Sequence, residues 1–175
     1  MKETMTFDDR VVVITGAGNG IGRAYAHEFA RRGAKVVVND LGGSVAGEGS
    51  DASAADNVVS EITAANGHAI ANYDSAVDGE KVVQSALDEW GRVDVLINNA
   101  GIAYSTPFDE MTPELWDRML SVHVDASYAC TKAAWAHMVA AGYGRLMFTS
   151  SPFGLYAAST FAHYSAAKAA MLGLS

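Results

Sequence analysis

Residues 11–22 read VVVITGAGNGIG, and this stretch decides the fold of the chain. The β-branched run at residues 11–14 is typical of a strand buried on both faces. The apolar spacing of residues 21–32 predicts a helix that stops at Gly33. Between these elements, backbone N–H groups and the positive end of the helix can face a pyrophosphate with no Cβ in the way. The stretch therefore predicts a phosphate-binding unit, and a glycine-rich turn that only needs positive φ is the alternative.

Strands and helices alternate along the remaining sequence. A long helix is expected at residues 113–141, with Thr112 as its N-cap and Pro113 as its first residue. The alternation predicts an α/β protein with a Rossmann-type, doubly wound parallel sheet in three layers, which binds ligands at the carboxyl ends of its strands. The expected strands are residues 35–39, 68–73, 93–97 and 145–150, and the expected helices are 54–65, 78–90, 113–141 and 159–174.

Composition and charge narrow the function classes. The 175 residues are 50% hydrophobic and 18% charged, so residues 1–175 are expected to form one folded domain. Twenty acidic and 12 basic side chains give a net charge of −8, which disfavours nucleic acid and anionic lipid as partners. Small molecules are the expected ligands.

Cysteine content and the N-terminal residues bear on location. Cys130 is the single cysteine, so an internal disulfide and a cysteine-cluster zinc site are excluded, and no metal is expected. The first ten residues do not read as a signal peptide, and the longest uncharged stretch, residues 146–167, contains Pro152 and many hydroxyl groups. We therefore expect a cytoplasmic protein with no membrane span.

Asp40 closes the expected strand at residues 35–39. A carboxylate there can accept hydrogen bonds from both adenosine ribose hydroxyls and would repel a 2′-phosphate, so NAD is favoured over NADP. No lysine or arginine lies between Gly16 and Gly22, which supports the same choice. The alternative for Asp40 is a solvated loop acid. Residues 41–51, rich in glycine and serine, are expected to form a long loop beside the site.

The sequence Asn98-Asn99-Ala100-Gly101 follows another expected strand at the same edge of the sheet. Its small residues let the backbone lie against a flat ligand, so we expect the cofactor's ribose there. A plain turn is the alternative.

Tyr164 and Lys168 share one face of the last expected helix, so the ammonium can stabilise a tyrosinate that acts as general acid or base. Tyr128 and Lys132 have the same spacing. Ser151 distinguishes the pairs, because it stands thirteen residues before Tyr164, whereas no hydroxyl residue stands at that distance before Tyr128. We therefore assign Ser151, Tyr164 and Lys168 to catalysis and the other pair to structure.

Together these motifs resemble the short-chain dehydrogenases/reductases, and the resemblance runs over residues 11–175. It implies hydride transfer between a nicotinamide and a carbonyl or alcohol carbon, with Tyr164 as acid/base, Ser151 polarising the substrate oxygen and Lys168 on the nicotinamide ribose. It also implies that Asp74 and Ser75 flank the adenine. The expected cofactor-binding residues are Gly16, Asn19, Gly20, Ile21, Gly22, Asp40, Asp74, Ser75, Asn98, Ala100, Gly101, Tyr164 and Lys168.

Three stretches resemble one branch of the family, the (3R)-hydroxyacyl-CoA dehydrogenase units of multifunctional β-oxidation enzymes. They are VVNDLGG at 37–43, ANYDS at 71–75 and AAWAHM at 133–138. The resemblance implies a 3-hydroxyacyl-CoA substrate. The alternatives are an alcohol, sugar, steroid or 3-oxoacyl-carrier-protein reductase of the family, and a non-catalytic dinucleotide-binding module or inactive fragment.

Two features depart from the family pattern. His123 stands where the family has a catalytic asparagine; it can donate and accept hydrogen bonds but also titrates, so it is a catalytic candidate, with a packed helical histidine as the alternative. The chain also stops at Ser175, inside the tyrosine helix, so we expect the last two strands of the family fold to be missing. Alanine-rich helices agree with the homodimer or homotetramer that the resemblance implies, although alanine also simply favours helix.

Overall fold

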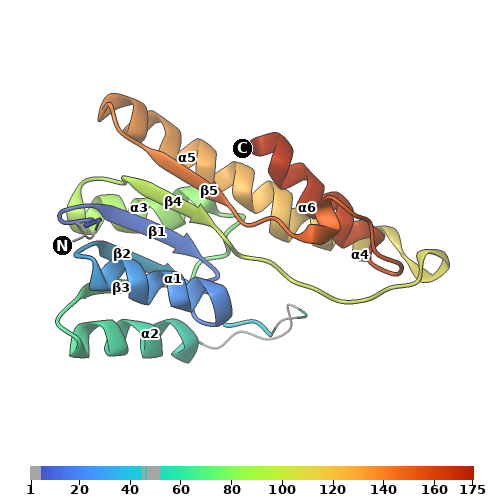
Figure 1. Cartoon of the computed structure of the whole chain (residues 1–175), viewed down its shortest axis with the longest axis horizontal. Coiled ribbons are helices and arrows are strands. Elements are labelled where there is room, and N and C mark those ends of the chain that lie inside the picture. The colour runs from blue at the N-terminus through green and yellow to red at the C-terminus, as the bar shows by residue number, and fades with distance from the viewer. Residues whose placement is uncertain (1–4, 45, 47–51) are drawn as a thin grey trace.

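The computed structural model describes residues 5–44, 46 and 52–175, and its centre is a parallel sheet (Figure 1). The strands are β1 (Val11–Thr15), β2 (Lys35–Asn39), β3 (His68–Asn72), β4 (Val95–Asn98) and β5 (Arg145–Phe148). They pair in the order β3-β2-β1-β4-β5, and every pair is parallel. Because the chain leaves β1 first toward β2 and later toward β4, the order switches between β1 and β4, where such sheets bind ligands. The predicted Rossmann-type fold is confirmed.

Helices cover both faces of the sheet (Figure 1). Alternate side chains of β1 point to opposite faces: Val12 and Ile14 pack against α1 and α2, and Val11 and Val13 pack against α3 and α5. This alternation produces the three layers expected from the sequence. The helices are α1 (Gly20–Arg31), α2 (Ser53–Ala64), α3 (Gly79–Trp90), α4 (Pro113–Leu120), α5 (Ala126–Ala140) and α6 (Ala162–Leu174), with the short turns η1 (Phe108–Glu110) and η3 (Pro152–Gly154).

Two helices differ from their predicted form. The helix expected at residues 113–141 starts as predicted, with the Thr112 hydroxyl accepting a hydrogen bond from the Leu115 N–H at 3.3 Å. A π-helical turn, η2 (Ser121–Asp125), then divides it into α4 and α5. The helix expected from residue 159 begins at Ala162, because Thr160 has a φ of +62°, which no right-handed helix contains.

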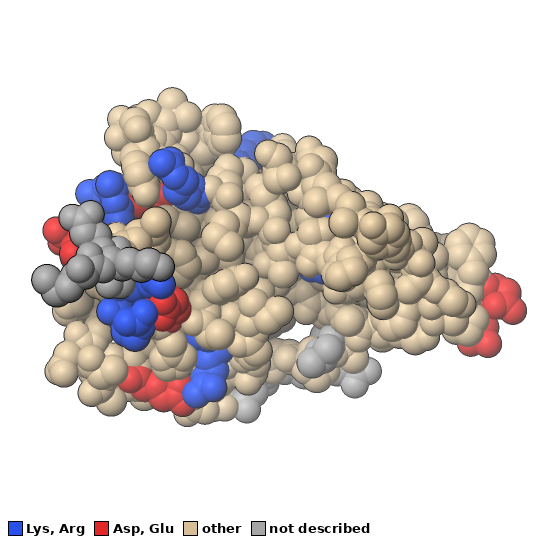
Figure 2. Space-filling model, viewed as in Figure 1, with Lys and Arg blue, Asp and Glu red and all other residues tan. Residues whose placement is uncertain are grey.

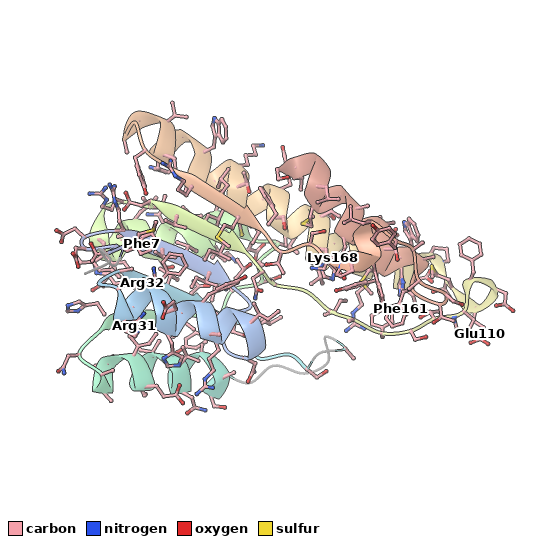
Figure 3. All side chains as sticks on the ribbon, in the orientation of Figure 1. Phe7, Arg31, Arg32, Glu110, Phe161 and Lys168 are labelled. Carbon is pink, nitrogen blue, oxygen red and sulfur yellow. The ribbon has the colours of Figure 1, made fainter. Side chains whose placement is uncertain are left out.

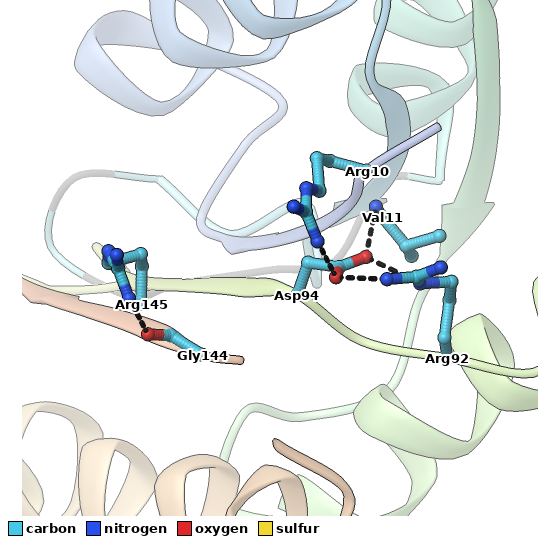
Figure 4. A network of polar contacts seen from close by, with 6 residues as sticks. All are labelled: Arg10, Val11, Arg92, Asp94, Gly144 and Arg145. Carbon is cyan, nitrogen blue, oxygen red and sulfur yellow. Dashed lines mark hydrogen bonds and ion pairs between the residues drawn. The ribbon is translucent and has the colours of Figure 1, made fainter. Parts of the chain in front are cut away.

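A polar network ties the amino ends of the strands together, on the side away from the switch point (Figure 4). The Asp94 carboxylate is 1% exposed and accepts hydrogen bonds from the Val11 N–H at 2.9 Å, from Arg10 Nη1 at 2.9 Å and from Arg92 Nη2 at 2.6 Å. The Arg10 guanidinium also lies over the Tyr143 ring, 3.8 Å from its centroid. The network therefore connects β1 to the segment that enters β4.

In the part of the chain that the structure describes, no helix is both long and apolar enough to span a bilayer. Within the same residues, no three histidine, cysteine, aspartate or glutamate side chains gather as metal ligands would.

Candidate functional site

A cavity of about 620 Å³ lies at the carboxyl ends of the strands, and residues at the end of all five strands line it. Its volume is within the range of small-molecule and cofactor sites. The cavity brings together most of the residues singled out in the sequence. Those lining it are Gly16, Asn19, Gly20, Ile21, Asp40, Asp74, Ser75, Ala100, Gly101, Tyr164 and Lys168.

The glycine turn has the shape that a phosphate group needs. Gly16 has a φ of +64°, and a Cβ there would lie 2.8 Å from the Ala100 Cα, so only glycine fits between the two loops. Asn19 caps α1 without a side-chain hydrogen bond to its first turn, and Asn19, Gly20 and Ile21 line the cavity where the helix begins. Gly22 is buried in α1 and lies outside the cavity lining. A Cβ at this position would collide with the Gly16 carbonyl, so the turn requires glycine there. The turn therefore fits a dinucleotide pyrophosphate.

Two backbone amides fix Asp40 at the edge of the cavity. One carboxylate oxygen accepts from the Gly18 N–H at 2.7 Å and the other from the Gly42 N–H at 2.7 Å. A Cβ at Gly18 would lie 2.8 Å from that carboxylate, so the turn and the acid are fitted to each other. Of the loop expected at residues 41–51, Leu41, Gly43 and Ser44 line the cavity; residues 45 and 47–51 lie outside the described residues.

Asn99, and not Asn98, faces the cavity. Asn98 is the last residue of β4 and points to the opposite face, where its side-chain amide donates to the Thr131 hydroxyl at 3.1 Å. Asn99 lines the cavity, and its amide donates to the carbonyls of Thr15 at 3.1 Å and Gly16 at 3.0 Å. Asn98 thus lies outside the set of described residues that line the cavity, because successive residues at a strand end alternate in direction, and a cofactor-binding role for Asn98 stays a prediction.

Asn39 was missed by the sequence reasoning. It is 2% exposed, lines the cavity, and donates to the Asn72 Oδ1 at 2.8 Å and to the Asp74 carbonyl at 2.8 Å. Asn72 in turn donates to the Asp74 carboxylate at 2.9 Å. These bonds hold Asp74 and Ser75 at the end of the cavity next to β2 and β3. A polar residue that ends an apolar strand was the available signal.

Tyr164 and Lys168 lie on the cavity face of α6, and Figure 3 shows Lys168 near the middle of the molecule. Lys168 is 4% exposed, and its Nζ donates to the Thr149 carbonyl at 2.8 Å and lies 5.7 Å from the centroid of the Tyr164 ring. Burial lowers the pKa of Lys168 to about 8. The arrangement places a desolvated ammonium beside a phenol that faces the cavity.

Ser151 lies outside the set of described residues that line the cavity. It is half-buried, and its hydroxyl accepts from the Phe153 N–H at 3.2 Å, which caps the turn η3. The neighbouring Ser150 hydroxyl donates to the Lys168 carbonyl at 2.8 Å and so ties the end of β5 to α6. A substrate-polarising role for Ser151 stays a prediction.

His123 lies in the π-helical turn and is 2% exposed. Its Nε2 lies 2.9 Å from the carbonyl and 3.2 Å from the N–H of Ile102, and its ring packs edge-on against Tyr164 at 5.5 Å between centroids. Burial, and then the nearby Lys168 charge, lower the pKa of His123 to about 4, so the ring is neutral at neutral pH. The ring also explains Gly101, where any Cβ would collide with it. His123 therefore supports Tyr164 from behind the cavity wall.

The second tyrosine–lysine pair has the same local geometry in a different setting. The Lys132 Nζ lies 5.7 Å from the centroid of the Tyr128 ring, but Tyr128 is 56% exposed and both residues line a separate groove between α3 and α5. Its geometry matches that of the first pair, so only the setting differs.

Comparison with known proteins places the chain in a family. The model of the family described as short chain dehydrogenase matches residues 10–175. The chain is 55% identical over 171 residues to the peroxisomal multifunctional enzyme A of Dictyostelium discoideum, covering 98% of this chain and 39% of that protein. It is 52% identical to the mouse peroxisomal multifunctional enzyme type 2, covering 99% of this chain and 24% of that protein. The chain thus spans well under half the length of these relatives.

A solved structure agrees with this placement. A 7α-hydroxysteroid dehydrogenase complexed with NADH and 7-oxo glycochenodeoxycholic acid is 30% identical and superimposes with a TM-score of 0.87, covering 97% of this chain and 64% of that one. The expectation of a cytoplasmic location is wrong, because these two multifunctional relatives and three others at 47% to 50% identity are named peroxisomal.

Proposed function

Because this chain belongs to the short-chain dehydrogenase family, we propose that it is an NAD-dependent oxidoreductase that interconverts a secondary alcohol and a ketone. One observation carries the proposal: Tyr164 and Lys168 face the same cavity as the glycine turn that fits a pyrophosphate. A module that only binds a dinucleotide needs the turn but has no use for a buried ammonium beside an accessible phenol.

Each residue of the site has a proposed role in binding or in catalysis. The turn from Gly16 to Ile21 holds the pyrophosphate, Asp40 the adenosine ribose, and Asp74 with Ser75 the adenine. The nicotinamide, when bound, accepts or supplies the hydride. Tyr164 takes the proton from the alcohol oxygen, or returns it to the ketone oxygen, and the Lys168 ammonium favours the phenolate form. Lys168 also donates to the nicotinamide ribose, while Ser151 donates to the substrate oxygen.

The cofactor is proposed to be NAD rather than NADP. The Asp40 carboxylate is held in place by the Gly18 and Gly42 amides at 2.7 Å each, so it has little freedom to move away from a 2′-phosphate. Repulsion between the carboxylate and that phosphate supports NAD. In wild-type protein, NADP is therefore expected to bind at least about tenfold more weakly than NAD. Asp40→Asn is expected to bring the two dissociation constants closer together.

The substrate is proposed to be a (3R)-hydroxyacyl-CoA. The resemblance of residues 37–43, 71–75 and 133–138 to the (3R)-hydroxyacyl-CoA dehydrogenase units supports this substrate. The names of two relatives at 50% identity, both peroxisomal hydratase-dehydrogenase-epimerases, support a dehydrogenase and a peroxisomal location. A steroid is the competing substrate, because the similar hydroxysteroid dehydrogenase holds 7-oxo glycochenodeoxycholic acid.

The test is NADH formation from NAD by the complete protein that carries residues 1–175. It is offered (3R)- and (3S)-3-hydroxybutyryl-CoA, a simple secondary alcohol and a hydroxysteroid. Turnover of the (3R) thioester alone is expected. Turnover of the steroid alone would replace the substrate, and NADH binding without turnover of any alcohol would identify a non-catalytic dinucleotide-binding module.

We also propose that the chain forms a homodimer or homotetramer through α5 and α6. Large apolar side chains are exposed on both helices, including Trp135 at 57%, Val139 at 63% and Leu172 at 47%. Figure 2 shows few charged residues over the part of the surface formed by β5 and α6. Sedimentation should give a dimer or larger, and Trp135→Glu should shift it toward monomer.

A further inference from the structure

The turn η3 (Pro152–Gly154) follows Ser151 directly and packs on α6. None of its three side chains has a role in the proposed reaction. Its contacts with α6, however, are made at Tyr164 and Lys168. The position of η3 on α6 therefore bears on where Ser151 lies relative to that pair.

Gly154 brings the turn against the backbone of α6. A Cβ at Gly154 would lie 2.7 Å from the carbonyl carbon of Lys168, 2.8 Å from its carbonyl oxygen and 2.9 Å from the Ala169 nitrogen. The φ angle of Gly154 is negative, so alanine could adopt the backbone conformation itself. Glycine is therefore required here by the close approach of η3 to α6, and not by a strained turn.

Neighbouring residues hold the same part of the chain to α6. The Ser150 hydroxyl donates to the Lys168 carbonyl at 2.8 Å, and the Lys168 Nζ donates to the Thr149 carbonyl at 2.8 Å. The ring of Phe153 packs edge-on against Tyr164, with 6.2 Å between the centroids. The end of β5 and the turn after it are thus held against one turn of α6 at several points.

The same turn orients the hydroxyl of Ser151. The Phe153 N–H donates to the Ser151 Oγ at 3.2 Å, and the Gly154 N–H donates to the Ser151 carbonyl at 2.9 Å. A hydroxyl has one proton and two lone pairs, and the Phe153 amide occupies a lone pair. The proton is therefore left to donate, as the proposed hydrogen bond from Ser151 to the substrate oxygen requires.

We infer that Gly154 is a positioning residue: because it lacks a Cβ, η3 can approach α6, and this approach sets the separation between the Ser151 hydroxyl and the Tyr164 phenol. The inference rests on the proposed function, since it assumes that both groups act on one substrate oxygen. It assigns to a residue without a side chain the relative placement of two groups that come from different elements.

The size of the effect follows from the contact distances. Carbon atoms in contact lie about 3.5 Å or more apart, so a methyl group on residue 154 would push the two segments apart by about 1 Å. Lys168 is 4% exposed within a helix, whereas Pro152 and Phe153 are exposed, so η3 is the segment that moves. A misplacement of about 1 Å in a catalytic group can lower the rate about 100-fold.

The test measures kcat for NADH formation from NAD and (3R)-3-hydroxybutyryl-CoA, together with the dissociation constant of NADH and the temperature of unfolding. Gly154→Ala is expected to lower kcat about 10-fold to 100-fold and to leave the NADH dissociation constant within about twofold of wild type. Gly173→Ala is the matched control, because it makes the same substitution in α6 where a Cβ would meet nothing within 4 Å. If Gly154→Ala does not fold, Ser150→Ala, which loosens the same contact with Lys168, is expected to lower kcat at least about threefold.

A second background shows whether Gly154 acts through Ser151. In Ser151→Ala protein the positioned hydroxyl is gone, so adding Gly154→Ala is expected to change kcat by less than about twofold. The pH dependence of kcat reports the ionisation of Tyr164, and it is expected to be the same in Gly154→Ala as in wild type. This second measurement decides the question where Ser151→Ala turns over too slowly to compare.

Four results would overturn the inference. They are an unchanged kcat in Gly154→Ala, an equal loss in the presence and absence of the Ser151 hydroxyl, a shifted pH dependence, and a folded Gly154→Ala variant that no longer binds NADH. The last two would assign the contact to Tyr164 or Lys168. If wild-type protein oxidises none of the alcohols offered, the proposed function fails, whereas turnover by wild type and Gly154→Ala alike removes only the role of Gly154.

Discussion

At the scale of single residues, burying the ammonium of Lys168 lowers the stability of the fold, although the proposed chemistry requires that ammonium beside Tyr164. Its pKa is about 8 in the folded chain against 10.5 for an ordinary lysine. Between these values only the unfolded chain holds the proton, so stability rises as the pH goes from 8 to 10.5, and the cost is fully present below pH 8. The site is therefore a stability–function compromise.

Lys168→Met removes this cost. It is expected to raise the free energy of unfolding at pH 7 by up to about 3 kcal/mol while abolishing turnover, and the gain should shrink as the pH approaches 10.5. Urea unfolding at pH 7 and pH 10 measures it. Lys132→Met, in the exposed pair, should change stability by less than about 0.5 kcal/mol at either pH. A less stable Lys168→Met at pH 7 would show that the bond to Thr149 outweighs desolvation.

At the scale of elements, the start of α6 depends on one residue in a left-handed conformation. Thr160 has a φ of +62°, two residues before Ala162. Its carbonyl accepts from the Thr106 N–H at 2.8 Å, and its hydroxyl accepts from Ser105 at 2.6 Å, so the loop after β4 holds it in place. The same contacts fix where α6, and with it Tyr164, begins.

Two substitutions isolate the free-energy cost of the left-handed backbone conformation at residue 160. Both Thr160→Gly and Thr160→Ala remove the hydroxyl, and only alanine keeps a Cβ. The glycine variant is expected to be more stable than the alanine variant by about 1 kcal/mol, because a left-handed conformation costs an L-residue about that much. Thermal unfolding compares them. Equal stabilities would mean that residue 160 leaves the left-handed region once its hydroxyl no longer accepts a hydrogen bond from Ser105.

At the scale of the whole molecule, the strand ends have opposite roles: the carboxyl ends form the cavity and the amino ends carry the Asp94 network. Burial alone would raise the pKa of Asp94, but hydrogen bonds from Arg92, the Val11 amide and Arg10 outweigh it and hold that pKa below its ordinary value of 3.8. Its contribution to stability is present above pH 3.8 and is lost as the pH falls through the folded pKa.

Asp94→Asn is therefore expected to lower the free energy of unfolding at pH 7 by about 3 kcal/mol, with a smaller deficit below pH 3.8. Urea unfolding at pH 7 and pH 3 measures both values. Asp88→Asn, at an exposed acid of α3, is the matched control and should change little. A deficit that is independent of pH would mean that shape, rather than charge, makes Asp94 necessary.

The parts of this fold that could be predicted are those written locally in the sequence. The run at residues 11–14 and the glycines after it predict β1, its turn and α1, because buried parallel strands are apolar and the turn needs residues without a Cβ. Tyr164 and Lys168 could be chosen over Tyr128 and Lys132 because of Ser151. Other features depend on contacts between distant residues: the π-turn around His123 meets Ile102, and Arg118 reaches Ala46. That Asn99 rather than Asn98 lines the cavity could not be predicted either, because the direction of a side chain depends on where its strand ends.

The central claim is that Tyr164 moves the proton in the cavity that holds the dinucleotide. The most direct measurement compares NADH formation by Tyr164→Phe and Tyr128→Phe in the complete protein, with the NADH dissociation constant of each. We predict that Tyr164→Phe lowers kcat at least about 100-fold with NADH binding within about twofold of wild type, and that Tyr128→Phe changes neither. A Tyr164→Phe variant that turns over at the wild-type rate would contradict the account.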